Sequence, residues 1–407
     1  MFARIVAVLA AVALAPAVAV AQEAQVSAPA GIDPAVLEGK IDALAEQYAE
    51  TKGDVASLKR LKLSGYLQAR YGWSEAASYN ISEQGTATTA ANPAAAPANQ
   101  GFFIRRGRFK AVYDADQSAY VLQIDVIPAG FSIKEGYATL KLPKGFAVDA
   151  GLQLFPFGYE VASRSSSDLD TLERAAVTRA FLDGEYDLGV ALRGKVSVVD
   201  FKVGLFNGNG IKGNPIGLDN DPLKDVIGRA TVDFGFITAG LSGWYGKTRN
   251  YLRNDDKVYD RTRFAVDAQL YLDLIGLGGT ALKGEWMVGT NAIGGTLGMG
   301  ATTPGVAALD TAVPATGHGW YLMLVQNVLA DVQLAARYEQ YVANNALVPT
   351  TTKFKQRNEV QVAAHYYLGQ NYKFSASWYH PTAADLGPTA VADLKQDQLF
   401  LQAQAKF

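Results

Sequence analysis

The last ten residues, QLFLQAQAKF at positions 398–407, alternate between apolar and polar side chains. Successive side chains of an extended strand point to opposite faces, so a period of two separates the two kinds. One face carries Leu399, Leu401, Ala403, Ala405 and Phe407. The other carries Gln398, Gln402, Gln404 and Lys406, with Phe400 as the exception. A strand with one apolar face, one wet face and an aromatic end favours a transmembrane β-barrel, in which lipid contacts one face and an aqueous lumen the other.

The N-terminus predicts export from the cytoplasm. Arg4 precedes a short apolar run, and Ala19-Val20-Ala21 follows as a small-residue cleavage site. This arrangement is that of a bacterial secretory signal, whereas a membrane anchor would need a longer and less alanine-rich run. We therefore expect residues 1–21 to be a signal peptide that is removed from the mature protein.

Composition narrows the remaining possibilities. No later apolar run is long enough for a transmembrane helix, so a membrane role must rely on strands. Charged residues make up 19% of the chain, below the usual quarter of a soluble domain, while 20 tyrosines, 18 phenylalanines and 40 glycines are present. The absence of cysteine excludes disulfide frameworks, thiolate metal sites and cysteine nucleophiles. A net charge of −2 provides no basic field for nucleic acid.

Enzyme signals are weak. The three histidines, His318, His365 and His380, fall in separate segments, and no metalloprotease, serine-hydrolase or phosphate-loop motif is present. The loop 207–225 contains oxygen ligands that could bind calcium, but a polar surface loop is the simpler interpretation. We expect a protein that is not an enzyme and holds no cofactor.

A helix is predicted between the expected signal peptide and the strands, within a lead at 22–60. Asp33 is a suitable N-cap and Pro34 a suitable first helical residue. Residues then recur at steps of four and three, the spacing of a coiled-coil seam. The seam consists of Leu37, Ile41, Leu44, Tyr48, Thr51, Val55 and Leu58. A short self-associating coiled coil and a single helix lying on a domain both remain open.

From residue 61 to 407 the apolar period becomes two, and the patterns predict an all-β, antiparallel barrel of about sixteen strands. The expected strands are 61–73, 102–114, 119–127, 131–142, 146–155, 186–195, 201–206, 226–234, 237–246, 263–273, 277–289, 320–328, 332–341, 359–368, 372–379 and 399–407. Tight turns are expected at Val199-Asp200 and at 368–371. Long loops are expected at 74–100, 207–225, 291–317 and 381–395, and alternation of short and long connections is typical of outer-membrane barrels.

The strand at 103–113 is the densest basic segment. Alternation places Arg106, Arg108 and Lys110 on one face, and the cost of charge in lipid makes that face the lumen. Arg105 shares the opposite face with Phe103, which is acceptable only near a rim or at a β-bulge. Three cations along one stripe can form an anion path. In the alternative, they are ordinary wall residues that pair with acids on neighbouring strands, and three acids are available: Asp125, Glu135 and Asp149.

The mixture of the other charged residues indicates a water-filled wall and not a dedicated binding site. Further cations of lumen parity are Arg70, Arg193, Arg229, Arg263, Lys283, Arg337 and Lys373, and acids are Asp187, Asp233, Asp267, Glu285 and Glu339. The segment 158–180 lacks alternation and is mixed in charge, with Arg164 and Arg174 among its cations. It either folds inward and narrows the pore or forms an external loop.

These segments together resemble the phosphate-selective porin O/P family of Gram-negative outer membranes. The matching pieces are LSGYLQARYG at 63–72, FIRRGR at 103–108, GLQLFPFGYE at 151–160, LER at 172–174, FNG at 206–208 and the terminal Phe407. The resemblance covers about residues 61–407. It implies a sixteen-stranded trimeric porin with an inward third loop and an Arg/Lys path for phosphate-like anions, in which Arg105 and Arg106 match the paired arginines of the constriction.

The chain departs from the phosphate-specific members at three positions. Tyr66 stands where they have an arginine, Lys134 precedes Glu135 where they have an aspartate, and Ser167 aligns roughly with a loop lysine, with Arg164 and Arg174 nearby. We therefore expect a broader anion preference, with Lys134 adding positive charge. The alternatives are a general diffusion porin, a barrel that acts as an adhesin or surface enzyme, and a secreted soluble β-protein.

Overall fold

The computed structural model describes residues 34–75, 100–128, 130–182, 185–208, 210, 222–249, 258–273, 276, 278–290, 316–342, 356–384, 392–393 and 397–407. They belong to two compact units, Met1–Lys59 and Arg60–Phe407. The expected signal peptide and most of the expected long loops lie outside the described residues. No helix in the described ranges is both long enough and apolar enough to cross a membrane.

The described part of the first unit, residues 34–59, contains one helix, α2 (Pro34–Leu58). It begins at Pro34, as predicted, because proline already has helical φ and lacks only an N–H that the first turn does not use. Five of the predicted seam residues are exposed large apolar side chains: Ile41, Leu44, Tyr48, Val55 and Leu58. The helix therefore carries an apolar stripe that is exposed among the described residues of its unit.

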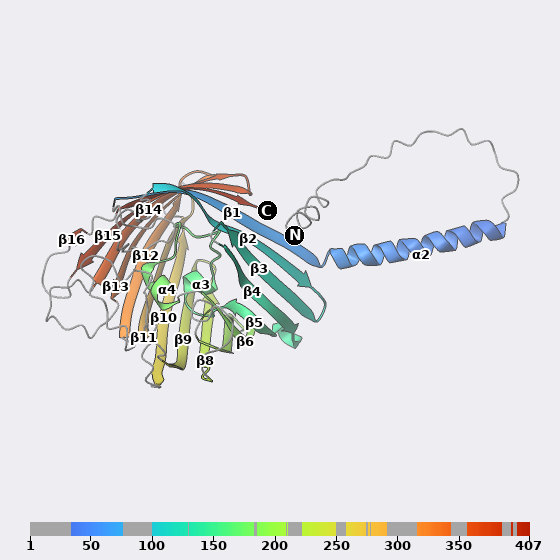
Figure 1. Cartoon of the computed structure of the whole chain (residues 1–407), viewed down its shortest axis with the longest axis horizontal. Helices are drawn as coiled ribbons and strands as arrows, with labels where there is room; N and C mark the ends of the chain where they lie inside the picture. Colours follow the sequence, from blue (N-terminus) through green and yellow to red (C-terminus); the bar gives the residue numbers. More distant parts are fainter. Residues whose placement is uncertain are drawn as a thin grey trace. The chain divides into compact units, whose positions relative to one another are not determined.

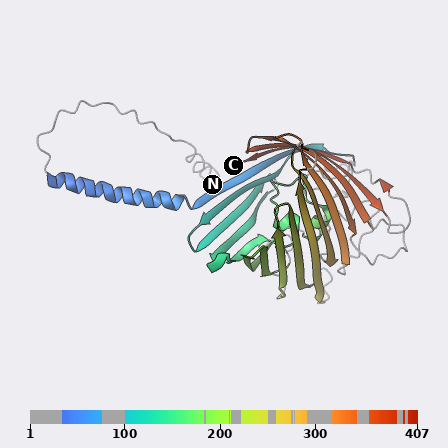
Figure 2. The same ribbon diagram turned by 180° about the vertical axis from the view of Figure 1, so that it is seen from behind.

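The second unit is an antiparallel β-barrel (Figures 1 and 2). Its strands are β1 (Leu61–Ser74), β2 (Gln100–Asp114), β3 (Ser118–Ile127), β4 (Gly130–Lys141), β5 (Ala147–Leu154), β6 (Tyr186–Val196), β7 (Val199–Phe206), β8 (Asp225–Asp233), β9 (Ile237–Arg249), β10 (Val258–Leu272), β11 (Thr280–Thr290), β12 (Thr316–Asn327), β13 (Val332–Val342), β14 (Gln356–Leu368), β15 (Tyr372–Ala384), the two-residue β16 (Ala392–Asp393) and β17 (Gln398–Lys406). Each strand from β1 to β15 pairs with the next, β15 also pairs with β17, and β17 pairs with β1, so sixteen of the described strands close the ring.

Side chains alternate between an apolar outer face and a mixed inner face. Along β10 the buried inner residues are Arg261, Arg263, Ala265, Asp267 and Gln269. The residues between them include Phe264 and Val266, which are exposed large apolar side chains. Every strand of the ring except β5 contributes such apolar residues to the outside, and this belt is what a barrel needs in order to contact lipid. The predicted fold class, a transmembrane barrel of sixteen strands, is confirmed.

The turns define two rims. A 3-10 turn, η3 (Pro143–Gly145), joins β4 to β5, and a tight turn at 369–371 joins β14 to β15, as predicted. The turn predicted at Val199-Asp200 is instead formed by Ser197 and Val198, where Ser197 has φ +55°. Valines on both sides of the turn extended the strand pattern and hid this boundary.

Two β-bulges interrupt the alternation. In β2, Arg106 lies opposite Gln68 but Ile104 lies opposite Ala69, so Arg105 is the extra residue. In β4, Glu135 lies opposite Gln123 but Ile133 lies opposite Ile124, so Lys134 is the extra residue. A bulge shifts the parity of every residue on one side of it. The sequence prediction that Phe103 faces lipid is therefore wrong, because the side chain packs inside against Leu172, Tyr379 and Phe400.

Candidate functional site

The connection from β5 to β6 folds into the barrel. It contains two short helices, α3 (Tyr159–Ala162) and α4 (Ala176–Phe181), which lie on the inner side of the strands (Figures 1 and 2). Apolar loop residues such as Phe157, Val161 and Val177 are almost completely buried against the inner wall. Of the two interpretations left open for 158–180, the inward one is correct.

Two wall glutamates receive the first backbone amides of the loop helices. Tyr159 N donates to Glu285 Oε1 over 2.6 Å at the start of α3, and Ala176 N donates to Glu339 Oε1 over 3.0 Å at the start of α4. These N–H groups have no partner within a helix, so the carboxylates satisfy them. Gly158, with φ +70°, lets the chain turn into α3, and a Cβ there would lie 2.7 Å from Glu285 Oε1.

Wall cations hold the loop from other strands. Arg337 of β13 pairs with Glu160 over 2.9 Å and also pairs with Glu339. Lys283 of β11 pairs with Asp170 over 2.6 Å. Two further side chains donate to or contact loop carbonyls: Lys373 Nζ lies 2.8 Å from Ser167 O, and His365 Nε2 lies 2.8 Å from Asp170 O. The loop is thus tied to much of the ring.

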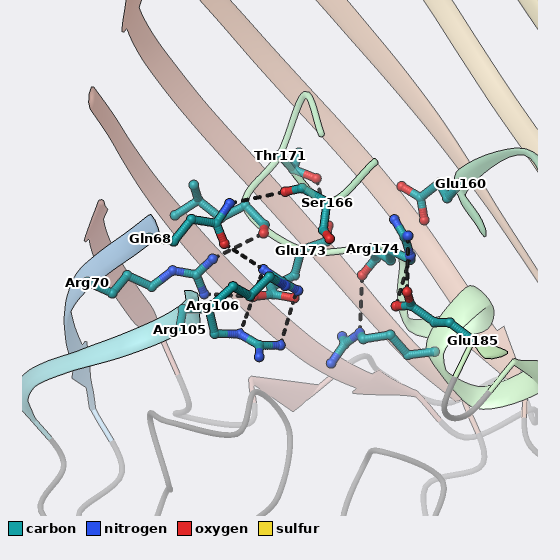
Figure 3. Close-up of polar contacts among 12 residues, drawn as sticks. Gln68, Arg70, Arg105, Arg106, Glu160, Ser166, Thr171, Glu173, Arg174 and Glu185 are labelled. Carbon is teal, nitrogen blue, oxygen red and sulfur yellow. Dashed lines mark hydrogen bonds and ion pairs between the residues drawn. The ribbon is translucent and has the colours of Figure 1, made fainter. Parts of the chain in front are cut away.

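The far end of the loop places one carboxylate among three arginines (Figure 3). Glu173 Oε1 accepts from Arg70 Nη1 and from Arg105 Nε, each over 2.7 Å. Glu173 Oε2 accepts from Arg106 Nη2 over 2.9 Å and from Arg105 Nη2 over 3.1 Å. Burial would raise the pKa of Glu173, but the guanidinium groups outweigh it and hold that pKa well below its usual range. Three guanidinium groups against one carboxylate leave two positive charges in this cluster.

The bulge in β2 is what assembles the cluster. It directs both Arg105 and Arg106 toward Glu173, although neighbouring residues of a regular strand would point to opposite faces. The departure of Arg105 from strand parity therefore has a physical cause. Gln68 completes the arrangement by accepting from Arg106 Nη1 over 3.0 Å.

The other basic residues of β2 pair with acids of the neighbouring strands. Arg108 Nε lies 3.5 Å from Asp125 Oδ2, and Lys110 Nζ lies 2.6 Å from Glu135 Oε2. Arg108 also donates to the Tyr186 hydroxyl over 2.9 Å. The stripe is inward-facing, as its pattern indicated, but it is a row of ion pairs and not a row of uncompensated cations.

A similar arrangement lies on the wall formed by β4 to β7. Arg193 Nε and Lys202 Nζ both contact Asp149 Oδ2, over 3.0 Å and 3.1 Å. Thr139 Oγ1 donates to the other carboxylate oxygen over 2.7 Å. Two cations thus share one buried carboxylate.

In four of the inner ion pairs the base is clearly more exposed than the acid. The side chains of Arg105, Lys110, Arg193 and Lys202 are 28%, 31%, 47% and 25% exposed. Their acidic partners are Glu173, Glu135 and Asp149, and none exceeds 8%. Arg108 and Asp125 are about equally buried, and in the pair of Arg174 with Glu185 the acid is the more exposed member. The positive member therefore faces water in these four pairs but not in every pair.

The two loop arginines that the sequence singled out, Arg164 and Arg174, are engaged within the connection from β5 to β6. Arg164 pairs with Asp170 over 3.4 Å, and Arg174 pairs with Glu185 over 3.0 Å. Burial opposes ionisation of Glu185, but Arg174 and its neighbours lower the pKa of that carboxyl to about 2. Lys134 occupies the β4 bulge beside Glu135 and is half-buried.

Sequence reasoning missed two features of this site. No role was predicted for Glu173, which appeared only within the LER motif at 172–174. In the structure it is the acid around which Arg70, Arg105 and Arg106 gather. The sharing of Asp149 by Arg193 and Lys202 was also missed: only Arg193 was assigned to the lumen, and Asp149 was considered only as a partner for the strand at 103–113. The usable signal was the cross-strand register, because Lys202 lies directly opposite Arg193.

Comparisons with known proteins identify the fold. No protein-family model matches the chain, and no curated protein matches its sequence. Solved structures do match. An anion-selective porin from Comamonas acidovorans superposes with a TM-score of 0.57 at 12% identity, covering 85% of this chain and 99% of that one.

Two other structures give the same result. The outer membrane channel DcaP of Acinetobacter baumannii has a TM-score of 0.58 at 10% identity, covering 85% of this chain and 97% of that one. The trimer form of the outer membrane protein OmpT of Vibrio cholerae has a TM-score of 0.53 at 11% identity, with 85% and 99% covered. At these identities the likeness concerns architecture: the barrel unit has the fold of outer-membrane porins.

Proposed function

We propose that the protein is a passive channel of a Gram-negative outer membrane that prefers small anions, including phosphate-like oxyanions. The porin-type barrel, its apolar belt and the loop seated inside it support the channel. The single observation that carries the anion preference is that in four of the inner ion pairs the base is exposed to water while the acid is buried. The four bases are Arg105, Lys110, Arg193 and Lys202.

The physical reason is proximity in a confined space. An ion moving through the lumen approaches the exposed guanidinium and ammonium groups more closely than it approaches the buried carboxylates. Coulomb interactions fall with distance and are screened less where water is limited. The surplus charge around Glu173 acts in the same direction. A permeant anion is therefore favoured despite the net charge of −2.

The pairing of Arg108 and Lys110 with acids supports a broad preference over strict phosphate selectivity. A continuous path of free cations could replace the hydration shell of a multivalent oxyanion. Here Arg108 and Lys110 already pair with Asp125 and Glu135, so fewer of their N–H donors are left for a permeant anion. The same observation favours the second candidate, a general diffusion porin with little selectivity, and the reversal potential separates the two.

We further propose a homotrimer, and α2 as a helix that associates with its copies. The support is the exposed stripe of Ile41, Leu44 and Tyr48 at coiled-coil spacing, together with the resemblance to trimeric porins. The mass of the detergent-solubilised protein tests the trimer. A monomer mass that is unchanged on deleting residues 33–58 would refute both parts.

Selectivity is tested with the double substitution Arg105→Gln and Lys110→Gln, measured as reversal potential in planar bilayers under a KCl gradient. Wild type should be anion-selective, and the double variant should shift several-fold toward cations because two exposed positive charges are lost. Glu173 keeps Arg70 and Arg106 as partners, so the loop stays seated.

A matched control removes two cations from the rim. Lys62 and Lys141 both pair with Asp114, and Lys62→Gln with Lys141→Gln changes the net charge by the same amount. This control should leave the reversal potential nearly unchanged. Cation selectivity of the wild type, or equal shifts in the two double variants, would overturn the proposed anion preference.

A further inference from the structure

A cavity of about 440 Å³ lies inside the barrel between the start of the loop and the wall of β4 to β8. Its lining includes Arg193 and Lys202 on the wall and Ala162 and Ser163 on the loop. The volume is within the range of small-molecule sites. The cavity does not include the Glu173 cluster.

The charged part of the lining has one positive charge in excess once its ion pairs are counted. Glu135 pairs with Lys110, Asp200 with Lys195, and Arg229 with Asp267. Arg193 and Lys202 share the single carboxylate of Asp149, which is buried beneath them. Arg193 donates to Asp149 through Nε, so the edge of the Arg193 guanidinium formed by the two Nη atoms is not directed at Asp149. That edge offers two parallel N–H donors, which match the two oxygens of a carboxylate.

Part of the cavity lining is apolar. Leu154, Phe155 and Pro156 form it where β5 passes into the loop. Leu154 packs on the buried cluster that contains Phe155, so this edge is anchored by the core. A solute that occupies the cavity therefore meets both a cationic and an apolar part of the lining.

We propose that this cavity is a binding site for small organic carboxylates with an apolar body, such as an aryl carboxylate. The carboxylate contacts Arg193 and Lys202, and the apolar body lies against Leu154 and Pro156. An inorganic anion would leave the apolar part of the lining in contact with water and gain nothing from it. The inference deepens the proposed function and rests on it, because only a water-filled lumen admits such a solute.

Calorimetry on the full chain in detergent tests the site without relying on conduction. Benzoate should bind about tenfold more tightly than acetate, because only benzoate covers the apolar part of the lining. Benzamide, which has the ring without the charge, should bind more weakly than benzoate. A benzoate affinity no greater than that of acetate or benzamide would overturn the proposal.

Substitutions assign the binding to this cavity. Lys202→Met and, separately, Arg193→Gln should each weaken benzoate binding about tenfold, whereas each leaves Asp149 with its other cation so that the wall stays paired. Lys406→Met removes an exposed cation of β17 that pairs with Asp168 of the loop. This variant should bind benzoate as wild type does. Unchanged binding in both cavity variants contradicts the site. If the wild-type protein binds benzoate but shows no anion selectivity in bilayers, only the proposed function is contradicted.

Discussion

The inner wall has two regions that use the same kinds of residue differently. Where the loop covers the wall, charged side chains such as Arg337, Lys283 and Glu285 are buried and bind loop groups directly. Where the wall faces the cavity, Arg193 and Lys202 lie partly in water above a buried acid. The difference shows that position relative to the loop, and not residue type or strand parity, decides whether a lumen charge holds the fold or meets a solute.

The largest expected effect separates the two regions by stability. Arg337→Met leaves Glu160 and Glu339 without their shared cation, and breaking a buried ion pair of this kind should cost about 3–5 kcal/mol in unfolding free energy. Lys195→Met removes an exposed cation paired with Asp200 and should cost under about 1 kcal/mol. Denaturant titration in detergent measures both. Equal costs would erase the distinction between the two regions.

A smaller effect is expected where the loop enters its seat. Gly158→Ala places a Cβ at a positive φ and beside the Glu285 carboxylate, and should cost about 1–3 kcal/mol. Gly101→Ala in β2 meets no atom within 4 Å and serves as the control, with an expected change near zero. The denaturant concentrations at which the two variants are half unfolded measure this difference. If Gly158→Ala were as stable as the control, the entry to α3 would not be constrained as described.

The smallest effect concerns pH. The folded pKa of Glu173 lies well below its unfolded value, so its contribution to stability is complete above the unfolded pKa and declines as the pH falls toward the folded one. The stability difference between wild type and Glu173→Gln should be constant from pH 7 to 5. By pH 4 it should shrink by under about 1 kcal/mol, since the unfolded pKa is about 4.3. A difference that shrinks already near pH 6 would show that the arginines do not hold this carboxylate ionised.

Much of the barrel follows from local patterns. Alternation of apolar and polar residues is a property of each strand alone, so the sixteen strands and the inward direction of Arg106 could be predicted from the sequence. Phe400 was the exception on the polar face of its strand. In the structure it points inward and packs on Leu172 and Tyr379, so an apolar residue on the wet face marks a place that the loop covers.

The candidate site could be predicted only in part, because its contacts depend on register and on the course of the loop. Nothing in the segment 100–114 shows that Arg105 is the extra residue of a bulge; that emerges only when β2 is aligned with β1. The partners of Arg108 and Lys110 are Asp125 of β3 and Glu135 of β4. The sequence offered these two acids and Asp149 without showing which acid pairs with which base. The place of Glu173 among three arginines depends on an inward path that the sequence left open.

The contacts of the loop also limit the order in which the loop and the barrel can form. Gln404 of β17 donates to Ser167 O, and the two residues are 237 positions apart in the chain. Contacts between distant residues form late because the chain entropy of closing so large a loop opposes them. Gln404 reaches its place only when β17 pairs with β1. The contacts between the loop and β17 therefore require the last strand to be in place, so the seat of the loop is complete only in the closed ring.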